Sequence, residues 1–309
     1  MAQGSFTLKI ASAVFAAMTG FAGLQADNFG IELTPEPVKS DVRAQTDADS
    51  AAGLGESNGA TTGVVVTDRA EKNKTYISGN GAHVQVKSPG FTQLLLSLHI
   101  YSQHGSDVSG VKKELESMLR LGATETTSNL WEKYGKDNSI SALVRRYDLQ
   151  ETTTNADWTQ VEVSPVDVNR ATKGFLNDGK VSWRLKRSFM DILKEPAENV
   201  AGFPQSWGFL ADMTAGNRNY AVKQSYTRSS KNNPPYRGGV AISNDTRFVS
   251  VMSLRWDDDK SDNEANDTIS RMAEQSWKRG VPVDNKEVPD FYIKKFRDDI
   301  KEKDDSLDK

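Results

Sequence analysis

The stretch "GGVAISNDTRFVSVMSLRW", residues 238–256, decides the fold class because it holds two strand-like runs around a turn signal. Asn244 and Asp245 are residues that favour the tight turn of a β-hairpin. After the turn, alternation places one set of side chains on a single face of the strand: Phe248, Ser250, Met252, Leu254 and Trp256. The stretch predicts an antiparallel hairpin.

Amphipathic helices are predicted before this hairpin. Residues 109–122 place Leu115, Met118 and Leu119 on one face and end at Gly122, a favoured residue just after a helix. Residues 183–196 repeat this pattern and end at Pro196, which stops helices. Helices first and strands later predict an α+β fold: a single domain with helices in its first half and an antiparallel sheet or hairpin region in its last third.

The amino-terminal segment indicates export. Residues 10–24 form an uncharged run of fifteen residues, which is short for a bilayer span and typical of a signal peptide. A retained helix is the alternative. We predict a signal peptide over 1–26, a disordered polar linker or pro-segment over 27–73, an α+β globular domain over 74–300 and a polar tail over 301–309. The protein is thus expected to be secreted, with no integral membrane span.

Composition excludes several classes of site. The formal net charge is −3, so no general basic field would collect nucleic acid, which is expected as a partner only for a coat protein. The chain has no cysteine, which excludes disulfides, thiol nucleophiles and thiolate metal sites. Phosphate-binding glycine motifs are also absent from the sequence, and no cofactor is expected.

Three residues are candidates for catalysis. His99 and His104 are five residues apart. Either could pair with Asp107 and a serine nucleophile, but no nucleophile-elbow motif identifies which serine that would be. Oxygen ligands for a metal ion gather in one acidic stretch: Asp257, Asp259, Asp262 and Glu264. That stretch lacks the spacing and the glycine of a calcium loop, so a solvated acidic loop is the preferred interpretation.

Two segments are candidates for partner binding. Trp183, Arg184 and Arg187 belong to the most basic helix and would suit a protein or another acidic surface. Tyr236 and Arg237 lie in residues 229–240, which we expect to form an irregular loop. An ordinary charged helix face and a simple connection are the alternatives.

The hypothesis about function rests on the absence of known catalytic motifs from the sequence. Because catalytic signatures are missing, we expect a secreted non-enzymatic binding protein, such as an effector or virulence-type factor of a host-associated microbe. A secreted hydrolase is one alternative. A self-assembling virion or filament coat protein is another, since the chain ends in polar arms and carries a basic patch. Asn73, Asn244 and Asn266 begin possible glycosylation sequons.

Overall fold

The computed structural model describes residues 40–69, 72–104, 107–197, 199–200, 203–214, 220–228, 235–243, 248–257 and 260–276. These residues belong to one compact unit that begins at Lys39. The predicted signal peptide over 1–26 and the polar tail over 301–309 lie outside the described residues.

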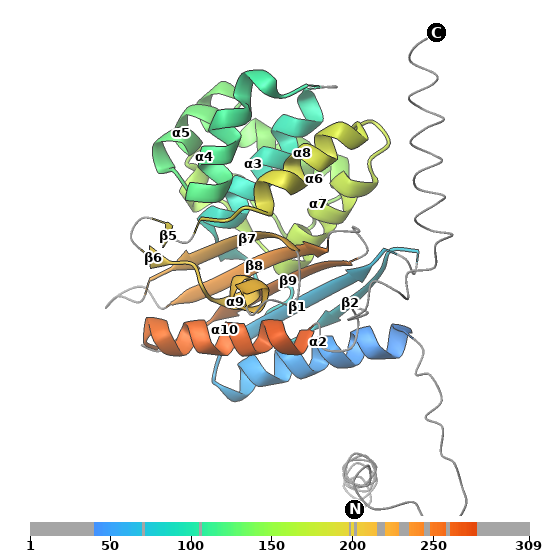
Figure 1. Cartoon of the computed structure of the whole chain (residues 1–309), viewed down its shortest axis with the longest axis vertical. Coiled ribbons are helices and arrows are strands. Elements are labelled where there is room, and N and C mark those ends of the chain that lie inside the picture. The colour runs from blue at the N-terminus through green and yellow to red at the C-terminus, as the bar shows by residue number, and fades with distance from the viewer. Residues whose placement is uncertain are drawn as a thin grey trace, which may run out of the picture. The chain divides into compact units, whose positions relative to one another are not determined.

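A five-stranded antiparallel sheet forms the centre, with strand order β2-β1-β9-β8-β7 (Figure 1). The strands are β1 Thr61–Asp68, β2 Lys74–Ser78, β7 Tyr220–Thr227, β8 Tyr236–Ser243 and β9 Phe248–Arg255. The predicted hairpin is confirmed, because β8 and β9 pair with Val240 opposite Val251. Its turn lies outside the described residues.

Helices cover both faces of the sheet (Figure 1). One face carries α2 Ser40–Ser57, α9 Gly208–Thr214 and α10 Asp262–Ser276. The other carries α3 Pro89–Gln103, α4 Lys112–Leu121, α5 Thr124–Lys133, α6 Asp137–Tyr147, α7 Pro165–Asn177 and α8 Trp183–Leu193. Short elements complete the fold: η2 Ser109–Val111, η3 Trp158–Gln160, the pair β3 Val86–Lys87 and β4 Glu162–Val163, and the pair β5 Asn199–Val200 and β6 Phe203–Pro204. The predicted α+β class is confirmed.

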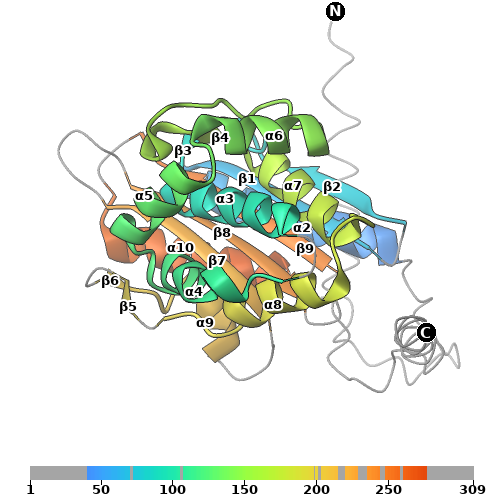
Figure 2. The ribbon, with the colours of Figure 1, turned by 90° about the horizontal axis from the view of Figure 1, so that it is seen from above.

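The two helical layers explain why the central strands are apolar on both sides. Along β8, Val240 and Ile242 pack in the core beneath α3, whereas Ala241 packs in the core on the α10 side. Strands buried on both faces read as near-continuous apolar runs. Figure 2 shows α3 in the middle of its helical layer, consistent with the burial of most of its residues.

The predicted linker over 27–73 is wrong for residues 40–68, which form α2 and β1, the strand that pairs with β2 on one side and β9 on the other. Alanines on α2 are buried, among them Ala48, Ala51 and Ala52, and pack in the same core as Val64 and Val66 of β1. Such small side chains give little periodic signal in a sequence, although they let a helix approach a sheet closely. The globular unit therefore begins well before residue 74.

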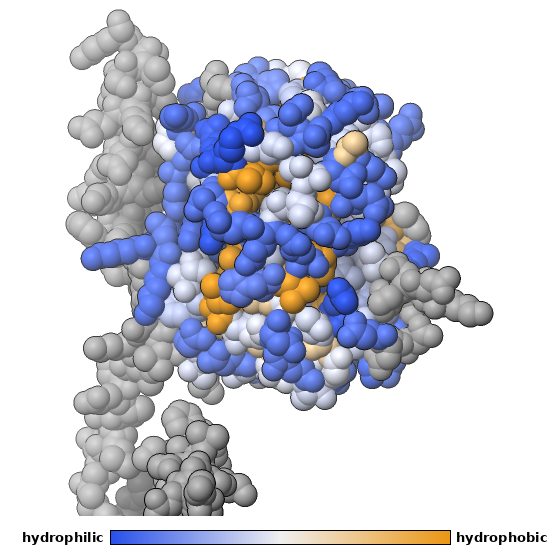
Figure 3. Space-filling model, turned by 180° about the vertical axis from the view of Figure 1, so that it is seen from behind, coloured by the Kyte–Doolittle hydropathy of each residue, from blue (hydrophilic) through white to orange (hydrophobic). Residues whose placement is uncertain are grey.

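No helix among the described residues is long and apolar enough to cross a membrane. On the face shown in Figure 3, apolar residues come to the surface in several separate patches among hydrophilic residues.

Candidate functional site

A pocket of about 240 Å³ opens along the edge strand β7, at the start of α3. We call it the β7 pocket. Its polar lining comes from Gln93, Arg120, Thr124, Gln205, Lys223, Gln224, Ser225 and Tyr226. Trp158, Leu210 and Val222 supply apolar walls. Because β7, α3 and the α4–α5 junction come from distant parts of the chain, only folding assembles this site.

Lys223 is a buried charged residue in the lining of the β7 pocket. Its side chain is 6% exposed, and its Nζ atom donates a hydrogen bond of 3.0 Å to the carbonyl oxygen of Leu119. Burial lowers the pKa of Lys223 to about 7, because a low-dielectric environment disfavours the ammonium form. A large fraction of the Lys223 amines is therefore neutral near neutral pH, as a general base requires.

Ser225 lies on the same face of β7 as Lys223, because alternate strand residues share a face. The Oγ atom of Ser225 accepts two hydrogen bonds, one from the Oγ of Ser88 at 2.8 Å and one from the backbone N–H of Gly90 at 3.0 Å. Ser88 precedes α3, and Gly90 belongs to its first turn. Two donors and the positive end of a helix thus face the Ser225 oxygen, an arrangement that favours negative charge on it.

The start of α3 touches β7 directly. A β-carbon on Gly90 would lie 2.4 Å from the carbonyl oxygen of Gln224 and 2.7 Å from Cβ of Ser225, so only glycine fits. One turn later, Gln93 donates to Thr127 Oγ1 at 3.0 Å, which links α3 to α5. These contacts fix β7 relative to α3 and hold the position of Ser225.

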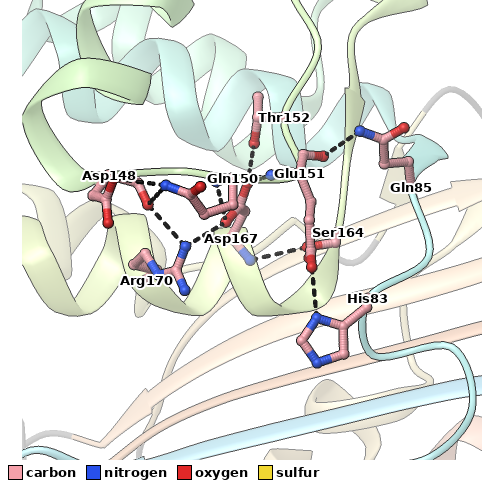
Figure 4. A network of polar contacts seen from close by, with 9 residues as sticks. All are labelled: His83, Gln85, Asp148, Gln150, Glu151, Thr152, Ser164, Asp167 and Arg170. Carbon is pink, nitrogen blue, oxygen red and sulfur yellow. Dashed lines mark hydrogen bonds and ion pairs between the residues drawn. The ribbon is translucent and has the colours of Figure 1, made fainter.

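A second polar cluster surrounds the buried Asp167 of α7 (Figure 4). Its carboxylate accepts hydrogen bonds from the backbone N–H groups of Gln150 and Glu151, from the Thr152 hydroxyl and from Arg170. Because three of its donors belong to Gln150, Glu151 and Thr152, Asp167 anchors the segment that follows α6.

The outer part of this cluster brings together Ser164, Glu151 and His83 (Figure 4). Ser164 donates to one carboxylate oxygen of Glu151 at 2.5 Å, and His83 contacts the other at 2.6 Å. In a catalytic triad the histidine lies between the serine and the acid. Here the acid lies between the other two groups and Ser164 is fully buried, so the cluster has a structural role.

The predicted catalytic residues do not form one site among the described residues. His99 is buried on α3, whereas the Nε2 atom of His104 contacts the hydroxyl of Tyr134 at 2.8 Å. Asp107 accepts hydrogen bonds from the N–H and hydroxyl of Ser109, and these lower the pKa of Asp107. Within the described ranges, their side chains share no hydrogen bond, and the one link among the three is from the backbone N–H of Asp107 to the carbonyl oxygen of His104 at 3.2 Å.

The predicted metal ligands are engaged elsewhere or lie outside the described residues. Asp262 pairs with Arg237, Asp257 pairs with Arg255, and Glu264 accepts from Ser261 in a capping box at the start of α10. Asp259 lies outside the described residues. Across the described part of the chain, no group of three acidic or histidine side chains is placed to hold a metal ion.

The predicted partner-binding residues divide into two sets. Trp183, Arg184 and Arg187 lie on α8, where Trp183 is exposed and Arg187 forms a surface ion pair with Asp191. Their role stays a prediction.

The expected loop at Tyr236 and Arg237 is wrong for residues 236–240, since β8 begins at Tyr236. Both side chains are buried, and the Arg237 guanidinium lies among the rings of Phe203, Trp207 and Tyr226. They are therefore not surface contacts, because strand pairing and packing enclose them.

The fold is similar to solved β-lactamase structures. A β-lactamase from Chitinophaga pinensis matches with a TM-score of 0.62 at 10% identity, covering 75% of this chain and 98% of that chain. TLA-3 extended-spectrum β-lactamase matches with a TM-score of 0.60 at 11% identity and the same coverage. A class A β-lactamase representative from Bacteroides cellulosilyticus gives 0.58 at 11%, covering 76% and 97%. The chain has a β-lactamase-like fold.

No known family and no curated protein matches the sequence. The structural likeness nevertheless contradicts the expected non-enzymatic binding protein or virulence-type effector. The similar structures carry the names of hydrolases. The inference of a non-enzymatic protein was wrong because it rested only on missing sequence motifs. A fold can persist when such motifs change.

The catalytic motifs of class A β-lactamases are S-x-x-K, S-D-N and K-T-G. In the described residues S-x-x-K occurs at Ser109–Lys112, beside α4, and S-D-N at Ser261–Asn263, on the opposite side of the sheet (Figure 1). K-T-G is absent from the sequence; Lys223-Gln224-Ser225 shares only its lysine. At the start of α3, Ser88 is followed three residues later by Phe91 instead of lysine. The β-lactamase motifs are therefore not assembled here.

Sequence reasoning missed Lys223 and Ser225. The sequence contained one signal. In the alternating run of residues 220–227, Lys223 and Ser225 fall on the same strand face as Ala221, which lies in the core. A lysine on the apolar face of a strand indicates either an edge position or a special role. The sequence could not show which face of β7 the helices cover.

Proposed function

We propose that this protein is a hydrolase of the acyl-transfer class, with Ser225 as nucleophile and Lys223 as general base in the β7 pocket. The observation that supports the proposal most directly is the buried Lys223, whose pKa is about 7, two residues before Ser225 on one strand face. Lysine acts as a base when burial lowers its pKa. The reaction class agrees with the names of the structurally similar β-lactamases.

The proposed reaction starts with attack of the Ser225 oxygen on the carbonyl carbon of an ester or amide. The hydroxyl proton passes to the neutral amine of Lys223, and the lysine then protonates the leaving group. Water, deprotonated by the same amine, attacks the resulting acyl-enzyme, and the Ser225 hydroxyl regains its proton as the acid leaves. The Ser88 hydroxyl and the Gly90 N–H lower the cost of negative charge on Ser225 Oγ.

The pocket restricts the substrate class. Its volume of about 240 Å³ is below the usual range for drug-sized ligands, so we propose small acyl groups. A β-lactam is not the proposed substrate, because the three motifs linked to that chemistry are not assembled.

The test combines covalent labelling with kinetics. We expect a fluorophosphonate probe to label Ser225, and p-nitrophenyl acetate hydrolysis to rise with pH and reach half its maximum near pH 7. Ser225→Ala should abolish labelling, and Lys223→Met should reduce turnover at least about 100-fold. Ser250→Ala is the matched control, since Ser250 is a buried serine on β9 outside the pocket. Labelling and turnover that survive Ser225→Ala would disprove the assignment.

Export is part of the proposal. The uncharged run over residues 10–24 has the length of a signal-peptide core, and hydrolases that act outside the cytosol need such a leader. Mass spectrometry of the protein from its native source should find a mature chain that begins near residue 27. A chain that retains residues 1–26 would contradict export.

A further inference from the structure

A second pocket, of about 280 Å³, lies beside the carboxyl-terminal half of α3, against α6 and the turn between α7 and α8. We call it the α3–α6 pocket. Its polar lining consists of His99, Ser102, Gln103, Arg145, Arg146 and Lys180. Every ionisable residue that lines it is basic, so the pocket favours an anion.

The positive charge of this pocket is only partly neutralised. Arg146 forms an ion pair of 2.6 Å with Asp178. Arg145 and Lys180 have no carboxylate partner among the described residues. Two positive charges therefore remain for a ligand at neutral pH.

His99 adds a neutral donor to the basic lining of this pocket. Its side chain is 8% exposed and makes no hydrogen bond within the described part of the chain. Burial, together with the positive charge of Arg146, holds the pKa of His99 below its ordinary value, so the ring is neutral and offers one N–H donor. Because His99 lines the pocket, this N–H is available to an anion bound there.

We propose that the α3–α6 pocket binds a phosphate dianion, either as inorganic phosphate or as the phosphate group of a small phosphomonoester. Arginine side chains match phosphate oxygens as paired donors, and a phosphate monoester carries about 1.5 to 2 negative charges near pH 7. Ala142 and Leu143 add apolar wall that suits a small organic group. The pocket is separate from the β7 pocket, because Gln93 and His99 are about 9 Å apart along α3.

Calorimetric titration of the full chain tests the proposal, with inorganic phosphate and glycerol 3-phosphate as probes. We expect saturable binding of at least one probe, weakened by added salt. Tighter binding of glycerol 3-phosphate would identify a phosphomonoester site, and equal or tighter binding of inorganic phosphate would identify a phosphate site. The absence of saturable binding to both would overturn the proposal.

Charge-matched variants locate the site. Arg145→Ala with Lys180→Ala should weaken binding at least about tenfold, since both uncompensated charges are lost. Lys113→Ala with Arg187→Ala removes the same charge from exposed positions on α4 and α8 and should leave the affinity unchanged. Equal losses in both double variants would show binding to the general surface charge and would overturn the assignment. His99→Leu should also weaken binding several-fold, with the far-ultraviolet circular dichroism spectrum unchanged.

Discussion

The Nζ atom of Lys223 on β7 donates a hydrogen bond of 3.0 Å to the carbonyl oxygen of Leu119 in the last turn of α4. Carbonyl groups in the last turn of a helix have no N–H partner within the helix. The lysine therefore satisfies a buried acceptor and joins the sheet to the helical layer. Burial nevertheless dominates the protonation of Lys223 and makes it a candidate base.

Lys223 makes stability depend on pH. Because its pKa is about 7 in the folded protein and 10.5 in the unfolded chain, the unfolded chain binds more protons between these values. The free energy of unfolding should therefore rise with pH across this window, by up to about 1.4 kcal/mol per pH unit. Urea denaturation of the wild type and of Lys223→Met at several pH values measures this rise, which the variant should lack. Lys113→Met, at an exposed lysine, should keep the wild-type slope.

Gly90→Ala and Gly53→Ala should have opposite effects, although both glycines lie in helices. The added methyl group at Gly90 would collide with the backbone of β7, and we expect a loss of about 2–3 kcal/mol. Gly53 of α2 has no atom within 4 Å of the new β-carbon, so alanine should stabilise the helix by about 1 kcal/mol. Thermal denaturation of the two variants checks the signs. A neutral Gly90→Ala would show that β7 and α3 can separate.

Asp167→Asn should destabilise the segment that follows α6. Asparagine offers one acceptor oxygen in place of two, so the amides of Gln150 and Glu151 and the Thr152 hydroxyl cannot all keep their partner. We expect a cost of about 2–3 kcal/mol and faster hydrogen exchange at these amides. Asp148→Asn is the control, because Asp148 is exposed and asparagine tolerates its positive φ of 54°. Comparable losses in both variants would contradict the anchoring role.

The Arg237–Asp262 pair should be strongly coupled. Arg237 is fully buried on β8, and Asp262 at the start of α10 supplies its carboxylate at 2.6 Å. Asp262→Asn should cost about 2 kcal/mol, and a double-mutant cycle with Arg237→Met should return a coupling energy of about 1–3 kcal/mol. The exposed pair Arg255–Asp257 should couple by less than about 1 kcal/mol in the same assay. Similar coupling in both cycles would rule out burial as the cause.

Short sequence patterns predicted the helices and strands that depend on neighbouring residues alone. The β8–β9 hairpin follows from alternation around a turn, and α4 and α8 follow from apolar residues at helical spacing. Gly122 adopts a positive φ of 60° after α4, as its place at the end of the pattern predicts. A strand over residues 63–68 could be read from the run Gly-Val-Val-Val, and it forms part of β1. The helix α2 escaped prediction because its buried face is built mainly from alanine in a polar context.

The residues of the two pockets could not be predicted from any short stretch of sequence. His99 and Lys180 are far apart in sequence and meet only because α3 packs beside the turn between α7 and α8. Tyr236 and Arg237 read as loop residues because prolines and glycines surround them, yet strand pairing buries both. Side-chain chemistry alone gives no measure of burial, and burial decides which groups titrate near neutral pH.

The sequence by itself determined the α+β class, the absence of cysteine chemistry and the positions of the strongest helices and of the hairpin, because each depends on composition or on neighbouring residues. Only the tertiary structure decided that β1 pairs with β9 inside the sheet, that Lys223 and Ser225 line a pocket, and that the fold resembles the β-lactamases. Those features depend on contacts between distant segments, whose pairing is set by the packing of the whole chain.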